Sequence, residues 1–179
     1  MRTSGWSGMT WGVVTLRPAR AHDVDDIARV WAGAWHDGHR GHVPDALTAA
    51  RDSAYFAARS VALLDHVTVA VDAGELLGVV IVKDDELQQL MVTAAARGRG
   101  VGALLLEEAE RQVRAAGGVE IWLAVVPGNT TARRFYEAHG WVDRGGETYD
   151  AVTLAGATVP VPVRRYVKRL ASRRGPTQG

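Results

Sequence analysis

The residues best suited to chemistry form one short run, Arg97-Gly-Arg-Gly-Val-Gly102. Glycines at alternate positions leave backbone N–H groups open to a ligand, because no Cβ shields them. The leucine-rich segment that follows is expected to be a helix, whose unpaired N–H groups and dipole point toward the same place. Arg97 and Arg99 add positive charge. The run predicts a phosphate or pyrophosphate site; the alternative is a tight strand-to-helix turn whose glycines serve packing.

Two common phosphate-binding loops fit this run poorly. A Walker loop is excluded because no Lys-Ser/Thr pair follows the glycines. The dinucleotide fingerprint matches only in its loosest form, at Gly98, Gly100 and Ala103, and residues 93–97 lengthen the turn that it expects. Glu120, the candidate for its ribose-binding acid, lies at the start of a strand rather than at its end.

The run resembles the acyl-coenzyme A loop of the GNAT superfamily of N-acetyltransferases. The family pattern Arg/Gln-x-x-Gly-x-Gly/Ala falls on Arg97, Gly100 and Gly102. One strand later, a second family pattern is matched by Asn129, Ala132, Phe135, Tyr136 and Gly140-Trp141, with Trp141 in place of the usual Phe. The two elements occur in the family's order, which is a stronger signal than either alone. The resemblance extends over about residues 14–170.

The resemblance implies that acetyl-CoA binds as co-substrate at a splayed sheet edge. The thioester would lie between diverging strands at 86–92 and 119–126. Asn129 would bind the pantetheine arm, cap the following helix, or do both. The implied cofactor-binding residues are Leu90, Met91 and Val92 for the pantetheine amides, Arg97, Gly98, Arg99, Gly100, Val101, Gly102 and Ala103 for the pyrophosphate, and Asn129, Ala132, Phe135 and Tyr136.

Acetyl transfer to an amine requires a neutral nucleophile, a polarised carbonyl and a protonated leaving thiol. By family position, Tyr136 is predicted to be the general acid, unless it only packs on the cofactor or the core. The backbone N–H of Val92 is predicted to stabilise the oxyanion. Glu86 is predicted to be a water-linked base, or else a solvated residue of the preceding turn. Gln88 shares its strand face and is predicted to line the acceptor site.

His36, His39 and His42 recur at every third position. By family position, Trp35, His36 and His39 are predicted to contact the acceptor, with surface histidines and a core tryptophan as the alternative. A metal site is the weaker interpretation, because Gly38 and Gly41 should break the helix here. No metal is therefore predicted.

Hydrophobic periodicity predicts the elements that position these residues. A helix is expected over about 45–59, with Leu47, Ala50, Ala54 and Ala58 facing inward, and another over about 99–116. The buried stripe of the second is predicted to be Leu104, Leu105, Ala109, Val113 and Ala116. The order of the elements predicts the α/β class with a mixed, largely antiparallel sheet. The resemblance implies the GNAT fold, a central mixed, mostly antiparallel twisted sheet of about seven strands flanked by about four helices.

Length and composition predict one soluble domain. It is placed at 12–171, between a flexible lead-in at 1–11 and a flexible tail at 172–179, and the resemblance implies that it is a GNAT acetyltransferase domain. The net charge of +1 gives no reason to expect a nucleic-acid partner, and no apolar run is long enough to span a membrane. The absence of cysteine excludes disulfides and a cysteine acyl-enzyme and fits the cytoplasm.

The predicted function is direct acetyl transfer from acetyl-CoA to a primary amine of an unidentified small molecule or peptide N-terminus. The alternatives are a non-catalytic acyl-CoA-binding sensor and a thioester hydrolase. A monomer or a homodimer is expected.

Overall fold

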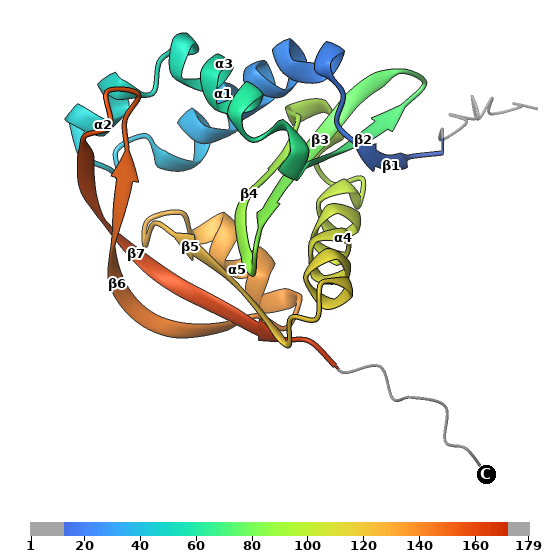
Figure 1. Ribbon diagram of the computed structural model, residues 1–179. Coiled ribbons are helices and arrows are strands. Elements are labelled where there is room, and N and C mark those ends of the chain that lie inside the picture. The colour runs from blue at the N-terminus through green and yellow to red at the C-terminus, as the bar shows by residue number, and fades with distance from the viewer. Residues whose placement is uncertain (1–12, 172–179) are drawn as a thin grey trace, which may run out of the picture.

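The computed structural model describes residues 13–171, which form an open sheet with helices on both faces (Figure 1). The seven strands lie in the order β1-β2-β3-β4-β5-β7-β6, and only the β4–β5 pair is parallel. This mixed, mostly antiparallel sheet confirms the predicted fold class. The predicted lead-in and tail lie outside the described residues.

The elements follow one another along the chain as β1 (Thr15–Pro18), η1 (Ala21–Asp23), α1 (Val24–His39), α2 (Asp45–Ala50), α3 (Ser53–Ala62), η2 (Leu64–His66), β2 (Val67–Asp72), β3 (Glu75–Lys83), β4 (Glu86–Val92), η3 (Ala94–Ala96), α4 (Val101–Ala115), β5 (Glu120–Val125), α5 (Thr130–Ala138), β6 (Val142–Val152) and β7 (Thr158–Arg169).

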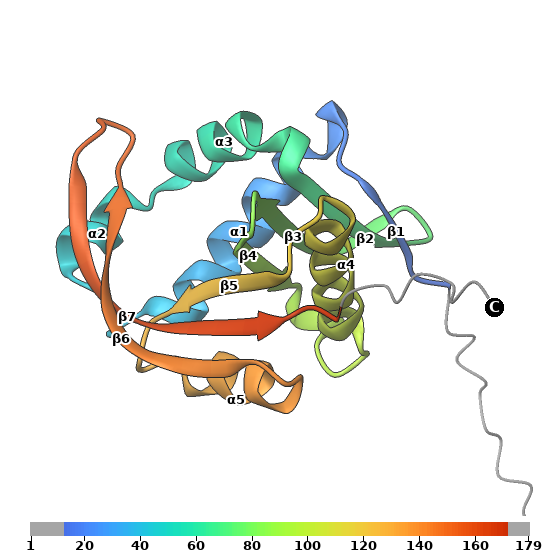
Figure 2. The same ribbon diagram turned by 60° about the horizontal axis from the view of Figure 1, so that its bottom comes forward.

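The core has two halves, one on each face of the sheet. Successive side chains of a strand point to opposite faces, and β3 is buried on both. Val80 and Val82 belong to the half that contains α4 and α5, whereas Val79 and Ile81 belong to the half that contains α1 and α3. Figure 2 shows α4 and α1 on opposite sides of β3 and β4. The long apolar run of β3 follows from this double burial.

The parallel strands β4 and β5 diverge almost at once. They pair at a single position, Glu86 with Trp122, whereas β4 pairs with β3 along its whole length. Two hydrogen bonds hold the point of divergence: the backbone N–H of Trp122 donates to the Asp85 carbonyl at 3.0 Å, and its indole N–H donates to the Asp85 carboxylate at 3.1 Å. The β5-facing edge of β4 is therefore left open beyond Glu86.

The β6–β7 hairpin extends from the edge of the sheet to the helices α1, α2 and α3. Figure 1 shows its closed end beside α2. Ala151, Val161 and Val163 pack in the same core half as α1 and α3. The Arg51 guanidinium, between α2 and α3, donates to the Val152 carbonyl at 3.0 Å. The hairpin thus closes one side of the space between the helices and the diverging strands.

The single helix predicted for residues 45–59 is wrong, because the chain breaks it into α2 and α3. Asp52 starts α3 by accepting a hydrogen bond from the Tyr55 N–H at 2.8 Å. This restart shifts the helical phase, so that Tyr55 and Phe56 are buried while Ala54 and Ala58 are exposed. Leu47 is buried as predicted.

Two further boundaries differ from the prediction. Helix α1 continues through Gly38 to His39 and ends before Gly41, which has the positive φ of 75°. On α4, Leu104 is 41% exposed and Ala116 lies beyond the helix, while Val101 and Leu106 are buried. The α4 helix begins later than predicted, at Val101, and its packing against the sheet buries a face that includes Val101 and Leu106 but not Leu104.

Candidate active site

The glycine loop ends in an uncapped helix N-terminus. Gly98 and Gly100 have φ values of 74° and 78°, in the left-handed region that disfavours side chains. Gly100 is the N-cap residue of α4, and no side chain accepts from the first turn. The first backbone donor that closes this turn is Leu104, whose N–H donates to the Gly100 carbonyl at 3.1 Å. The N–H groups of residues 101–103 are therefore available to an anion.

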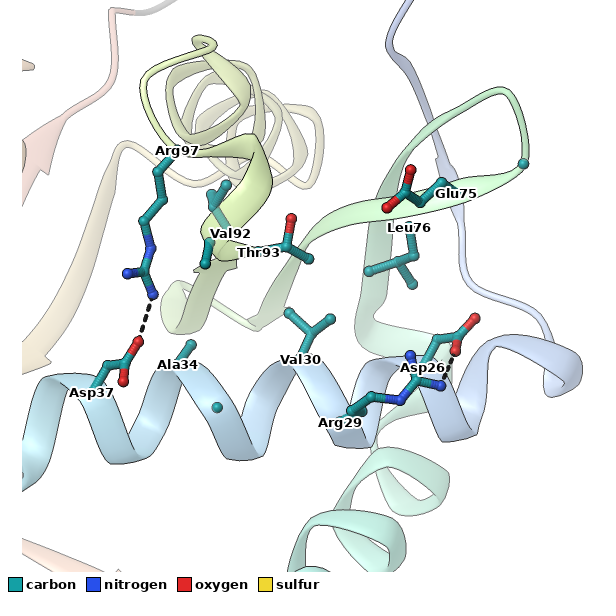
Figure 3. Close-up of a pocket in the computed structure, with 13 residues that line it drawn as sticks. Asp26, Arg29, Val30, Ala34, Asp37, Glu75, Leu76, Val92, Thr93 and Arg97 are labelled. Atoms are coloured by element: carbon teal, nitrogen blue, oxygen red, sulfur yellow. Dashed lines mark hydrogen bonds and ion pairs between the residues drawn. The ribbon is translucent and has the colours of Figure 1, made fainter.

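Both arginines of the loop make ion pairs with neighbouring elements. Arg97 donates to Asp37 of α1 at 2.7 Å, and Arg99 donates to Asp72 of β2 at 3.3 Å. The Arg97 hydrogen bond lowers the pKa of the Asp37 carboxyl. Figure 3 shows Arg97 reaching from the loop to Asp37 above the end of β4, beside a cavity of about 360 Å³ that Val92 and Thr93 also line.

The end of β4 directs alternate backbone groups toward the open edge. The Thr93 N–H donates to the Leu77 carbonyl of β3 at 2.9 Å. In an antiparallel strand, the N–H and C=O groups of one residue point to the same edge, and those of the next residue point to the other edge. The groups of Val92 and Leu90 are therefore directed away from β3, toward the diverging β5. Met91 between them is buried, at 4% exposure.

Helix α5 packs directly against this strand end and the start of α4. A Cβ on Gly102 would lie 3.4 Å from Phe135 and 3.7 Å from Val92, at van der Waals distance, so the three elements meet at this residue. The Asn129 side chain accepts from the Ala132 N–H at 3.1 Å, which is the predicted cap of α5. Ala132 and Phe135 are half-buried against the adjoining core. The structure thus brings the predicted cofactor residues of both motifs together.

Tyr136 lies on the inward face of α5. It is 7% exposed, and its ring packs near those of Phe135, Trp141 and Tyr166. Burial raises the pKa of its phenol well above the ordinary value. The hydroxyl therefore keeps its proton at neutral pH, which a general acid requires.

A second cavity, of about 230 Å³, lies on the opposite side of the diverging strands from α4 and α5. Residues of β4 and β5 form its floor, α1, α2 and α3 form one wall, and the β6–β7 hairpin forms another. Its lining residues are Trp31, Trp35, His39, Val43, Leu47, Arg51, Tyr55, Arg59, Glu86, Gln88, Gln89, Ala124, Val126, Tyr149, Ala151, Val152, Val161 and Val163. We call this space the acceptor-side cavity.

Glu86 and Gln88 both face the acceptor-side cavity. The Gln88 amide donates to the Glu86 carboxylate at 3.2 Å. Burial raises the pKa of Glu86, and the hydrogen-bonding side chains of Gln88 and Tyr149 offset part of that shift. A carboxyl with a raised pKa is a stronger base than a solvated one, and it lies where the two strands part.

Only some of the aromatic and histidine residues predicted for the acceptor site line the acceptor-side cavity. Trp35 and His39 line the cavity, with rings stacked at 4.6 Å, and His39 Nδ1 donates to the Trp35 carbonyl at 2.9 Å. Burial lowers the pKa of His39. His36 is not among the lining residues and instead contacts the edges of Trp35 and Phe56. His42 packs against Gly128, where a Cβ would lie 2.1 Å from its ring.

Residues 13–171 offer neither a cluster of metal-binding side chains nor a membrane-spanning helix. These residues contain no group of three His, Cys, Asp or Glu side chains placed to hold a metal ion. Among the helices of the same residues, none is both long and apolar enough to cross a membrane.

Arg51, Tyr55, Arg59 and Tyr149 line the acceptor-side cavity but were not assigned to it by the sequence analysis. Arg51 lies at the helix break that the periodicity concealed, and Tyr55 and Arg59 lie on α3, which starts after that break. Tyr149 comes from β6, far along the chain. Arg51 and its acceptor, Val152, are 101 residues apart, so no local pattern could have joined them.

The comparisons with known proteins agree with this geometry. The model of the acetyltransferase (GNAT) family matches residues 24–141. The chain belongs to this family. The match confirms the resemblance inferred from the two motifs, and it makes the protein a GNAT acyltransferase that carries out acetyl transfer. No curated protein matches the chain.

Solved structures share the GNAT fold over nearly the whole chain. A GCN5-related N-acetyltransferase from Rhodopseudomonas palustris is 22% identical, with a TM-score of 0.70 over 92% of this chain and 100% of its own. YncA from Salmonella typhimurium, solved with acetyl-CoA, is 16% identical, with a TM-score of 0.64 over 93% and 99%. The PaiA N-acetyltransferase from Thermoplasma acidophilum, solved with coenzyme A, is 17% identical, with a TM-score of 0.61 over 88% and 99%.

Proposed function

We propose that the protein transfers an acetyl group from acetyl-CoA directly to a primary amine. The observation that carries this proposal is the divergence of β4 and β5 after one paired position, beside a glycine loop that opens α4. The open edge suits the pantetheine amides, and the uncapped N–H groups of residues 101–103 suit the pyrophosphate. The acetyl-CoA and coenzyme A bound to YncA and PaiA support the choice of donor.

In the proposed reaction, the acceptor enters from the acceptor-side cavity as an ammonium ion. Glu86 takes its proton, directly or through a water. The amine nitrogen then attacks the thioester carbonyl carbon, and the Val92 N–H stabilises the oxyanion that forms. The nitrogen then loses its second proton, and as the carbon–sulfur bond breaks Tyr136 donates its proton to the sulfur. The proton released by the nitrogen restores the Tyr136 phenol through water. The products are an N-acetyl amide and coenzyme A with a free thiol.

Donor binding is tested by thermal melting with and without acetyl-CoA. We expect acetyl-CoA to raise the melting temperature of the native protein. In Gly100→Glu, a carboxylate occupies the anion site and the left-handed backbone is strained, so the shift should disappear. Gly146→Glu is the matched control, because Gly146 is exposed on β6 and no atom lies within 3.8 Å of its added Cβ. An unchanged shift in Gly100→Glu would contradict the assignment of the loop.

Catalysis is tested by following thiol release from acetyl-CoA with a panel of primary amines. Release that depends on the amine supports the transferase. Release without any amine would indicate a thioester hydrolase, and binding without release would indicate the non-catalytic sensor. A cytoplasmic location and a monomeric or homodimeric state are part of the same proposal, and size-exclusion chromatography with light scattering tests the latter.

A further inference from the structure

Two arginines of the acceptor-side cavity have no acidic partner within the part of the chain that the structure describes. Arg51 is 6% exposed; its guanidinium lies 3.8 Å from the centre of the Tyr55 ring and donates to the Val152 carbonyl. Arg59 is half-buried, and its Nε has no hydrogen-bond partner among the described residues. Within residues 13–171, neither arginine forms an ion pair with Asp or Glu.

Burial of these two guanidinium groups without a counter-charge lowers the stability of the folded protein. A buried positive charge without a counter-charge loses solvation that stacking on an aromatic ring restores only in part. Burial lowers the pKa of Arg51, and the nearby Arg59 charge acts in the same direction. The carboxylate of Asp52, the residue next to Arg51, is engaged with the Tyr55 N–H. An anion that entered the cavity would satisfy both guanidinium groups at once.

The cavity also holds one negative group, separated from the arginines. Glu86 lies on the β4 floor and forms no ion pair with Arg51 or Arg59. Tyr149 lines the same cavity, and its phenol is influenced electrostatically by both Glu86 and Arg59. The cavity is therefore polarised, with a carboxyl group near the diverging strands and two guanidinium groups toward α3 and the hairpin.

We propose that the acceptor is a small zwitterion, a primary amine that also carries an acid group such as a carboxylate. The inference rests on the proposed function. The ammonium would face Glu86 and the open edge of β4, the acid group would pair with Arg51 and Arg59, and the apolar part would contact Trp31, Trp35 and Leu47. A volume of about 230 Å³ suits a small metabolite, since sites for drug-sized ligands measure roughly 300–1,000 Å³.

The first test compares amino acids with the amines that lack only their carboxylate, such as phenylalanine with phenethylamine and methionine with 3-(methylthio)propylamine. Thiol release from acetyl-CoA gives kcat/KM for each. We expect every accepted amino acid to exceed its decarboxylated partner by about 10- to 100-fold, the worth of one or two charge-assisted hydrogen bonds. Aminophosphonates form a further arm that distinguishes a carboxylate from other acid groups.

The second test uses Arg59→Gln, Arg51→Lys and Arg51→Met. We expect Arg59→Gln and Arg51→Met to raise KM for the amino acid about 10- to 100-fold while KM for the decarboxylated amine changes little. Arg51→Lys should recover part of the loss, because it keeps the charge but not the paired donors. Arg169→Gln, on the exposed end of β7, is the control. Arg59→Gln also keeps the test valid if Arg51→Met fails to fold.

The possible results separate the two proposals. Equal activity on amino acids and decarboxylated amines, or equal losses on both in Arg59→Gln, would overturn the zwitterion and leave the transferase standing. A panel without any amine-dependent release would overturn the proposed function and this inference with it. Melting-temperature shifts caused by the amino acid, and lost in Arg59→Gln, support the site independently of catalysis.

Discussion

Arg97 of the glycine loop is paired with Asp37 of α1, at a distance of 2.7 Å (Figure 3). The ion pair connects two elements. One is the glycine loop, which is proposed to bind acetyl-CoA, and the other is α1, which carries Trp35 and His39 on the acceptor side. The two side chains are 53% and 63% exposed, so the bond is readily exchanged with solvent or with a ligand. A pyrophosphate at the loop would compete with Asp37 for the guanidinium.

We therefore expect Asp37→Ala to strengthen donor binding. Removal of the competing carboxylate frees Arg97, and an exposed ion pair should be worth about two- to fivefold in the Kd of acetyl-CoA. Titration calorimetry measures this change. Asp65→Ala, an exposed residue of η2, has the same effect on net charge and should leave the Kd unaltered. Weaker binding by Asp37→Ala alone would mean that Asp37 supports the loop rather than competing with the ligand.

Gly78→Ala tests how closely α4 must approach the sheet. An added Cβ would lie 2.8 Å from Leu105, 3.2 Å from Val101 and 2.8 Å from the Met91 carbonyl oxygen, which cannot move without shifting β4. We expect a loss of about 1–3 kcal/mol in the free energy of unfolding, measured by denaturant titration. Acetyl-CoA should also bind more weakly, because α4 and β4 both border its site. Gly146→Ala is the control, and equal stability of the two variants would contradict this packing argument.

The pH profile tests Glu86 as the base. The base acts when ionised, so kcat/KM should rise with pH through the raised pKa of Glu86 and then level off. Glu86→Gln should lower kcat and remove this acidic limb. If the acidic limb persists in Glu86→Gln, another titratable group is responsible, and His39 also lines the cavity.

Glu86 also predicts how the free energy of unfolding changes with pH, and this change has the opposite direction to that of kcat/KM. Because its pKa is higher in the folded than in the unfolded state, folded Glu86 binds the proton more tightly. Its contribution to stability therefore falls as pH rises from the ordinary pKa of 4.5 to the raised value. Glu86→Gln should flatten this part of the curve and leave the protein more stable at neutral pH. Denaturant titrations between pH 4 and 8 are the measurement.

Tyr136→Phe tests the general acid with little disturbance of the core. The ring keeps its contacts with Trp141 and Tyr166, so the fold should be retained. Loss of the proton donor should reduce kcat at least about 100-fold, with a smaller change in the KM of acetyl-CoA. Single-turnover measurements separate the chemical step from product release. Full turnover in the folded variant would restrict Tyr136 to packing.

Much of the proposed acetyl-CoA site could be predicted from the sequence. Strand β4 begins and ends at the predicted residues, Glu86 and Val92, because an apolar run between two turns has few alternatives. The left-handed conformations of Gly98 and Gly100 and the cap formed by Asn129 are likewise local. The Leu104 error shows the limit of periodicity, since packing against the sheet selects which of the neighbouring apolar residues of α4 are buried.

The sequence by itself thus determined the family, the strand and the loop that point to an acyl-CoA donor, because each depends on residues close together in the chain. Only the tertiary structure decided the acceptor side. There, the restart of the helix at Asp52, the single pairing of Glu86 with Trp122, and the return of the hairpin to Arg51 bring distant segments around one cavity. The physical reason is that such contacts depend on how separate elements pack, and a contact across 101 residues leaves no periodic or local signal in the chain.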